Sequence, residues 1–295
     1  MFPIIPANSA AESGNDEGIF GFGYSDSATG VTNLVSNAGV VATDAAAVGT
    51  ARWGPGACEY GGDKGIFGFG ASPGVKHAAT NLISNAGVVA TDTAGVGTGR
   101  EGSAACNYGG DRDTGIFGFG HTGSLSAVTN LVSNAGVVAT DQAAVTGTAR
   151  YYPAACEYGE DKGIFGFGAN TMTAVTNLVS NTGVVATDTA GVGTARMGLG
   201  ACGYGGDKGI FGFGSGYTAV TNLVSNAGVV ATDTAGVGTA RGMMAATQYG
   251  GDKGIFGYGQ PTSAVTNLVS NAGVVATDTT GVGTAREAPN ACSFN

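Results

Sequence analysis

The chain has 295 residues, of which 43% are hydrophobic and 11% charged, and a formal net charge of −9 at pH 7. Its 12 Lys and Arg residues form no basic run, which argues against nucleic-acid binding because phosphate contacts need clustered cations. The sequence has no apolar stretch of about 18 residues, so no membrane span is predicted. Its start, MFPIIPANSAAES, lacks a basic segment and a long apolar segment, so no signal peptide is predicted.

One phrase organises the chain and occurs six times. In its cleanest copy, from Tyr204 to Arg241, it is YGGDKGIFGFG, a short variable insert and AVTNLVSNAGVVATDTAGVGTAR. The Gly that opens GIFG recurs every 45 to 50 residues, at Gly18, Gly65, Gly115, Gly163, Gly209 and Gly254. Such a period is typical of a repeat architecture.

Each copy divides into four short apolar runs separated by turn residues. In the copy from Ala201 to Arg241 they are residues 201–204, 209–214, 220–225 and 229–234, all too short for a helix and rich in Val, Ile, Phe and Thr. We therefore expect a four-stranded antiparallel meander in each repeat. Six such sheets arranged radially predict an all-β, six-bladed β-propeller, which leaves only short, protected edges.

The two ends of the chain complement each other. Residues 13–18 align with the first hairpin of later copies, so the first repeat lacks its first strand, whereas residues 290–294 align with that strand and then the chain stops. We expect the C-terminal strand to complete blade 1 and close the ring. The predicted domains are an N-terminal arm at residues 1–12 and a single propeller domain at residues 13–295.

Each copy resembles the kelch repeat of β-propellers in the order of three features. These are a strand ending in Gly-Gly, a second strand ending in Gly, and a later Arg before a small-residue strand. The kelch Trp is absent from every copy, and Gly-Gly lies on the first hairpin. The phrases GIFGFG, TNLVSN and GVGTAR are more closely similar to kelch-like arrays in proteins of tailed bacteriophages and marine viral metagenomes, over residues 14 to 294. The resemblance implies a phage structural or accessory protein, located in the virion or the host cytoplasm.

Residues that recur in every copy are expected to be structural. The repeat Arg belongs to the scaffold, at Arg52, Arg100, Arg150, Arg196, Arg241 and Arg286. The Asp of each ATD phrase is expected to bond an Arg or backbone N–H groups, and the Asp of each first hairpin to cap its turn, with a calcium site at a hairpin as the alternative. One Cys per repeat, with Thr247 in one copy, predicts small buried core residues, and the alternative is a ring of soft metal ligands near the axis. No metal site, cofactor or catalytic residue is predicted.

The copies differ in the insert between the second and third runs and in the segment after the repeat Arg. In an up-and-down meander both sets emerge on one face, which suggests a recognition surface, although drift of unconstrained loops would produce the same variation. The candidate binding residues on this face are Trp53, Tyr151, Tyr152, Tyr24, His77, His121, Tyr217, Met197, Met243 and Met244.

These observations predict a non-enzymatic propeller that binds a protein or glycan, and also other virion proteins, but neither nucleic acid nor a membrane. The alternative is a purely architectural decoration module without a ligand. An enzyme with its site at the mouth of the axis would need clustered titratable groups, and the sequence pattern points to none.

Overall fold

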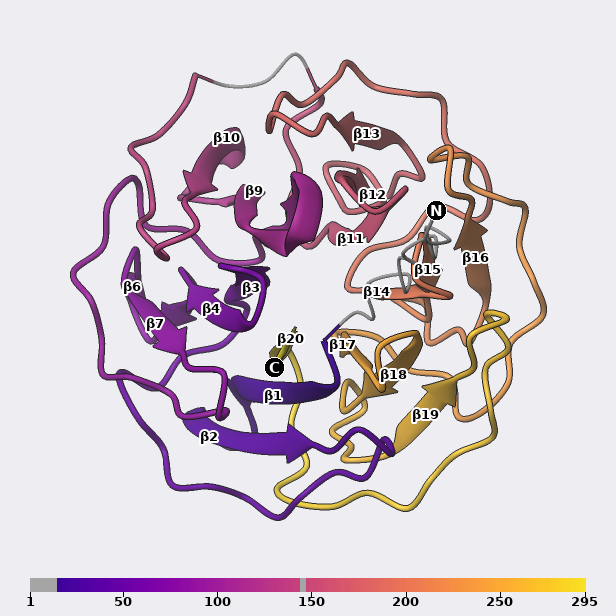
Figure 1. Cartoon of the computed structure of the whole chain (residues 1–295), viewed down its shortest axis with the longest axis horizontal. Helices are drawn as coiled ribbons and strands as arrows, with labels where there is room; N and C mark the ends of the chain where they lie inside the picture. Colours follow the sequence, from indigo (N-terminus) through magenta and orange to yellow (C-terminus); the bar gives the residue numbers. More distant parts are fainter. Residues whose placement is uncertain (1–14, 144–146) are drawn as a thin grey trace, which may run out of the picture.

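The computed structural model describes residues 15–143 and 147–295, and the predicted arm at residues 1–12 lies outside them. Within these residues the chain forms twenty strands and one short 3-10 helix, η1 (Gly110–Arg112). The strands make six three-stranded antiparallel sheets and one two-stranded sheet. The sheets follow one another around a ring (Figure 1), an arrangement consistent with the predicted all-β, β-propeller-like fold.

The sheets are built from consecutive strands of each repeat. In spatial order they are β2 (Ala28–Val35), β1 (Glu17–Tyr24) and β20 (Asn290–Phe294); β3 (Gly56–Tyr60), β4 (Lys64–Gly68) and β7 (Thr80–Ile83); β8 (Ala104–Tyr108), β9 (Thr114–His121) and β10 (Leu125–Val132); β11 (Ala154–Tyr158), β12 (Lys162–Gly166) and β13 (Thr176–Val179); β14 (Gly200–Tyr204), β15 (Lys208–Gly212) and β16 (Thr221–Val224); and β17 (Ala245–Tyr249), β18 (Lys253–Gly257) and β19 (Thr266–Val269). The two-stranded sheet pairs β5 (Ala71–Ser72) with β6 (Val75–Lys76).

The prediction of a regular fourth strand in each repeat is wrong in detail. The outer segment touches the third strand only at isolated bridges, such as Thr221 with Thr234 and Val224 with Val230. Between them the side chain of Asn222 donates to the carbonyl of Ala231 at 3.1 Å and to Asp233 at 2.8 Å, which replaces part of a backbone ladder. The outer segment is also largely exposed, with Val229 at 64%, so little burial holds it in a regular strand.

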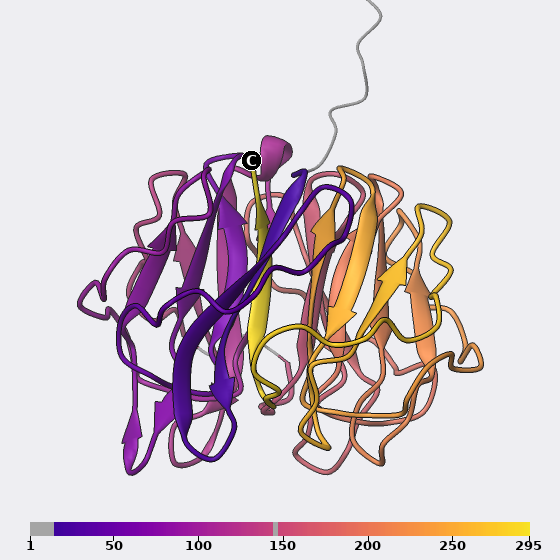
Figure 2. The same ribbon diagram turned by 90° about the horizontal axis from the view of Figure 1, so that it is seen from below.

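The two ends of the described chain share one sheet. β20 pairs with β1 over five residues, from Glu17 opposite Phe294 to Gly21 opposite Asn290, and Figure 2 shows the two strands side by side near the axis. The C-terminal strand therefore occupies the inner position that the sequence pattern left empty in the first repeat.

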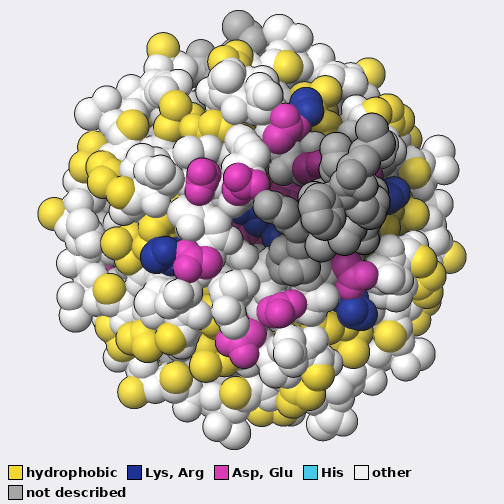
Figure 3. Space-filling model, viewed as in Figure 1, with side chains coloured by type: hydrophobic (Ala, Val, Ile, Leu, Met, Phe, Trp, Pro, Cys, Tyr) yellow, Lys and Arg dark blue, Asp and Glu magenta, His cyan; other side chains and the backbone are white. Residues whose placement is uncertain are grey.

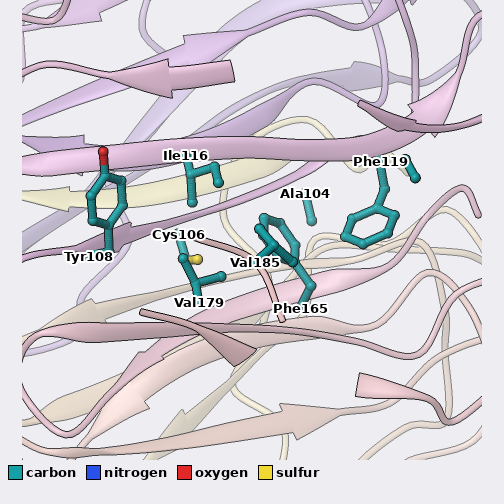
Figure 4. Packing of buried hydrophobic residues seen from close by; sticks show 9 residues of the cluster. Ala104, Cys106, Tyr108, Ile116, Phe119, Phe165, Val179 and Val185 are labelled. Carbon is teal, nitrogen blue, oxygen red and sulfur yellow. The ribbon is translucent and has the colours of Figure 1, made fainter. Parts of the chain in front are cut away.

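The core lies between neighbouring sheets. The first Phe of each GIFGFG phrase packs edge-on against the second aromatic residue of the preceding repeat, as in Phe119 with Phe165, whose ring centroids lie 5.1 Å apart (Figure 4). A Cβ on Gly118 would lie 2.8 Å from the Phe165 ring, so Gly at this place lets the adjacent sheet approach. The sequence GIFGFG thus encodes the contact between repeats.

The repeat Arg side chains, which the sequence assigned to the scaffold, join neighbouring repeats. Each guanidinium is buried and lies over the second aromatic ring of its own repeat, and Arg196 lies 4.5 Å from the centroid of Phe167. Its Nη2 donates to Asn222 in the next repeat at 2.6 Å. Burial lowers the pKa of Arg196 to about 10, which still leaves the group charged at neutral pH.

The ATD aspartates form a second set of links between repeats. Asp233 accepts hydrogen bonds from the backbone N–H of Thr194 at 3.1 Å and from its hydroxyl at 2.6 Å, across a repeat boundary. The same bonds join Thr284 to Asp44, which lie 240 positions apart in the chain. The predicted bonding of these carboxylates to backbone N–H groups is confirmed.

Among the described residues, the one helix is three residues long, far too short to cross a membrane.

Candidate functional site at the ring axis

One position on the inner strand of each sheet differs from repeat to repeat. It precedes the Tyr or Phe that recurs in the repeats and pairs with the Gly that opens GIFG, as Glu157 pairs with Gly163. The six residues are Glu59, Asn107, Glu157, Gly203, Gln248 and Ser293. All but Ser293 line an axial cavity between the inner strands.

Glu157 is the most heavily bonded of these residues. Arg112 donates to its two carboxylate oxygens, from Nε at 2.9 Å and from Nη2 at 2.5 Å. Asn107 donates at 2.5 Å, and Gln248 also donates to this carboxylate. Burial opposes ionisation of Glu157, but the Arg112 charge and these hydrogen bonds outweigh it and lower the pKa. Glu157 is therefore held as a carboxylate.

Glu59 lies in the opposite electrostatic situation. Its side chain is buried, and its Oε1 accepts hydrogen bonds from the backbone N–H of Ser293 at 3.1 Å and from the Ser293 hydroxyl at 2.6 Å. Burial, followed by the negative charge of Glu157, raises the pKa of Glu59 despite the charge of Arg112. Two carboxyl groups of one site are thus driven to different protonation states.

Arg112 comes from a hairpin found in one repeat. Residues Gly109 to Gly115 contain two more residues than the equivalent turn from Gly205 to Gly209. Asp111 and Arg112 adopt φ values of 61° and 53°, a left-handed conformation that residues other than Gly rarely take. This strained turn brings Arg112 to Glu157, where the guanidinium is largely buried.

Gly203 leaves room for the network at the axis. A Cβ at this position would lie 1.9 Å from Nε2 of Gln248 and 3.0 Å from Oε1 of Glu157. Gln248 therefore reaches Glu157 across the space that a side chain at position 203 would fill.

The space at the axis is narrow. One cavity of about 30 Å³ lies beside Glu59 and Glu157, and a second of about 50 Å³, lined largely by Ala residues, adjoins it farther along the axis. Such volumes hold on the order of one to three water molecules.

Figure 3 shows Asp and Glu side chains gathered around the centre of the face that carries the first hairpins, with a rim that is largely uncharged.

The cysteines are free and buried, which confirms their prediction as small core residues. Burial raises the pKa of the Cys58, Cys106, Cys156 and Cys292 thiols well above the ordinary value, so they stay protonated. In residues 15–143 and 147–295 no group of three or more His, Cys, Asp or Glu side chains is placed to hold a metal ion. The alternative of a soft-metal ring finds no support there.

The predicted binding residues are only partly brought together. Tyr24 packs edge-on against Trp53, with centroids 5.6 Å apart, and Trp53 Nε1 donates to Glu101 at 3.0 Å. Tyr151 lies 5.3 Å from Tyr152 and 6.0 Å from His121. The others are separate: His77 contacts Ser72, Tyr217 is 51% exposed, Met244 is buried, and Met197 and Met243 are half-buried. Much of this aromatic surface therefore packs against itself.

Glu59, Glu157 and Arg112 were not predicted from the sequence. Two signals point to them: the residue before the inner-strand Tyr changes from copy to copy, and the third hairpin is longer and carries Arg where the others carry Lys or Glu.

The sequence matches no protein-family model, and none of the curated proteins matches it. Among solved structures, a fungal alcohol oxidase of the AA5 family, described as catalytically diverse and in complex with copper, is similar in fold. The TM-score is 0.57 at 15% sequence identity, and the match covers 98% of this chain and 67% of the oxidase chain. Identity at this level shows likeness of fold alone.

This likeness contradicts the prediction of a non-enzymatic phage module, and with it the architectural alternative. A repeated β-architecture without a catalytic pattern in the sequence is no evidence against an enzyme, because an enzyme is built on a similar fold. The described residues do not fit a copper centre, because His77 contacts Ser72, His121 contacts Lys76, and the Cys side chains are buried on separate strands. No copper chemistry is assigned to this chain.

Proposed function

We propose that the chain is a closed β-propeller of six blades and an enzyme that performs acid–base catalysis at its axis. The six three-stranded sheets, the pairing of β20 with β1 and the bond from Thr284 to Asp44 support the closed ring. The observation that carries the activity is the buried pair of Glu59 and Glu157, whose pKa values move in opposite directions. Such pairs mark acid and base groups in enzyme sites.

In this proposal Glu59 is the proton donor and acceptor. It carries the proton because burial and the neighbouring carboxylate disfavour its charge. Glu157 keeps its negative charge through Arg112, Asn107 and Gln248, so it acts by holding Glu59 protonated. Arg112 is a positioning residue because it contacts Glu157 directly.

The size of the cavity favours water as one reactant. The reaction class is hydrolysis or hydration of a small neutral substrate that reaches Glu59 with its reacting oxygen. Glu59 donates its proton to that oxygen as water adds to the adjacent carbon, and the Glu59 carboxylate then takes the proton that the water releases. The residue thus returns to its starting state, and a positioned acid of this kind contributes about 10²- to 10⁴-fold in rate.

The test is turnover of a panel of small neutral acetals and epoxides by the wild type and Glu59→Gln. We expect hydrolysis of at least one compound, with kcat/KM reduced at least about 100-fold in the variant and an unchanged unfolding midpoint. Glu101→Gln, on the opposite face, is the matched control and should keep wild-type activity. Failure of the wild type to turn over any compound, or equal rates for Glu59→Gln and wild type, would overturn the proposal.

A further inference from the structure

The insert of the second repeat forms a separate two-stranded sheet, the one sheet of that kind among the described residues. β5 and β6 pair Ala71 with Lys76 and Ser72 with Val75 around a turn at Pro73 and Gly74. The hairpin places Ser72 Oγ 2.7 Å from Nε2 of His77, the residue that follows β6. A hydroxyl and an imidazole at this distance form the nucleophile–base contact of covalent catalysis.

The hairpin is held in place by the backbone. Trp53 and Ala71 exchange two backbone hydrogen bonds of 2.9 Å, and His77 N–H donates to the Gly70 carbonyl at 2.8 Å. The main chain on both sides of the pair is therefore fixed. Ser72 and His77 are half-buried, so a small reagent reaches the hydroxyl while the ring stays oriented.

The surroundings keep the imidazole in its basic form. Partial burial, followed by the positive charge of Arg52, lowers the pKa of His77, and a smaller effect of the Asp92 charge opposes this shift. A neutral ring at neutral pH accepts a proton, as a general base must. Lys76 is engaged with Glu101 at 3.0 Å and with His121 at 3.1 Å, which directs its ammonium group toward other partners.

The pair lies on the face of the hairpin opposite to Trp53. Ala71 pairs with both Trp53 and Lys76, and successive side chains of a strand point to opposite faces, so Ser72 and His77 share the other face. A single imidazole base suits activated esters, whose leaving group departs readily. We propose that Ser72 is a nucleophile activated by His77, and that it accepts acyl groups from small activated aryl esters.

The proposed reaction is transfer of the acyl group to Ser72, followed by hydrolysis of the acyl-serine. Ser72 Oγ–H transfers its proton to His77 Nε2 as Oγ bonds to the acyl carbon, and the bond from that carbon to the aryl oxygen breaks. The protonated imidazole then gives its proton to the phenolate that leaves. Water attacks the acyl-serine in the second half, which regenerates Ser72 and releases a carboxylic acid.

The test combines p-nitrophenyl acetate with a fluorophosphonate probe, which forms a stable bond to activated serine. Intact-mass spectrometry and peptide mapping should find one probe molecule per chain, on Ser72. We expect Ser72→Ala to lose the label and His77→Gln to be labelled at least about 100-fold more slowly, because the base is gone. Both variants should release p-nitrophenol correspondingly more slowly.

Two controls separate this site from alternatives. Ser124→Ala removes an exposed serine from the insert of the next repeat and should leave labelling unchanged. Glu59→Gln disables the axial site proposed above and should also leave labelling unchanged, so the two proposals fail independently. Equal labelling of Ser72→Ala and wild type, absence of label in folded wild type, or equal rates for His77→Gln and wild type would overturn the inference.

Discussion

The substitution Arg196→Ala tests the links between repeats most severely. Arg196 donates to the carbonyls of Phe213 at 2.7 Å and Thr194 at 2.8 Å, and to the side chain of Asn222 at 2.6 Å. Ala leaves these three acceptors without their donor, two of them buried and that of Thr194 partly buried, at about 1 kcal/mol each. Loss of the cation–π contact with Phe167 adds about 1 kcal/mol.

The expected loss in the free energy of unfolding is therefore about 4 kcal/mol, in the range found when one partner of a buried charged network is removed. Guanidinium titration followed by circular dichroism measures it, with the slope compared between variants to check that the transition stays two-state. Lys208→Ala is the control, since the Lys208 side chain is 42% exposed beside Asp207 and its loss should change stability by about 0.5 kcal/mol or less. A loss below about 1 kcal/mol for Arg196→Ala would refute the reasoning.

Three other outcomes are expected. The free energy of unfolding should fall steeply as pH drops below the ordinary Asp pKa of 3.8. The pKa of each ATD aspartate is lowered in the folded protein, so these groups stabilise the fold above that pH and lose this effect when they are protonated. A urea midpoint that is the same at pH 3 and pH 6 would contradict this. Deletion of Ala291 to Asn295 removes most of the inner strand paired with β1 and should cause aggregation, whereas soluble, monomeric protein with unchanged melting would count against closure of the ring. Gly203→Ala should displace Gln248 from Glu157 and raise the pKa of Glu157, which NMR titration of the carboxyl carbons measures. Gly216→Ala is the control, because its added Cβ meets no atom within 4 Å, and it should leave the titration of Glu157 unchanged.

The repeated features of this chain could be predicted because each residue type recurs with a fixed role. The Arg of GTAR, the Asp of ATD and the glycines of GIFGFG recur at fixed places, and their contacts between repeats follow from that regularity. The outer segment escaped prediction because its Val and Thr content suits a strand, whereas Asn222 and its equivalents bond to it through side chains.

The axial site could not be predicted in the same way, because it depends on residues that differ between copies. Glu59 and Glu157 lie on separate strands 98 positions apart, and the packing of the inner strands against one another brings their charges together. The reach of Arg112 depends on a strained turn that composition does not indicate. The variable inserts could be identified from the sequence, but the contact of Ser72 with His77 depends on the hairpin formed by β5 and β6.

The titration of Glu59 is the most direct test of the axial site. The NMR chemical shifts of the carboxyl carbons, followed against pH in wild type and in Glu59→Gln, assign the signal that the substitution removes. We predict that this signal titrates above the ordinary Glu value of 4.5, because burial and the charge of Glu157 favour the protonated form. A Glu59 signal that titrates at or below 4.5 would contradict the proposed proton donor and the function built on it.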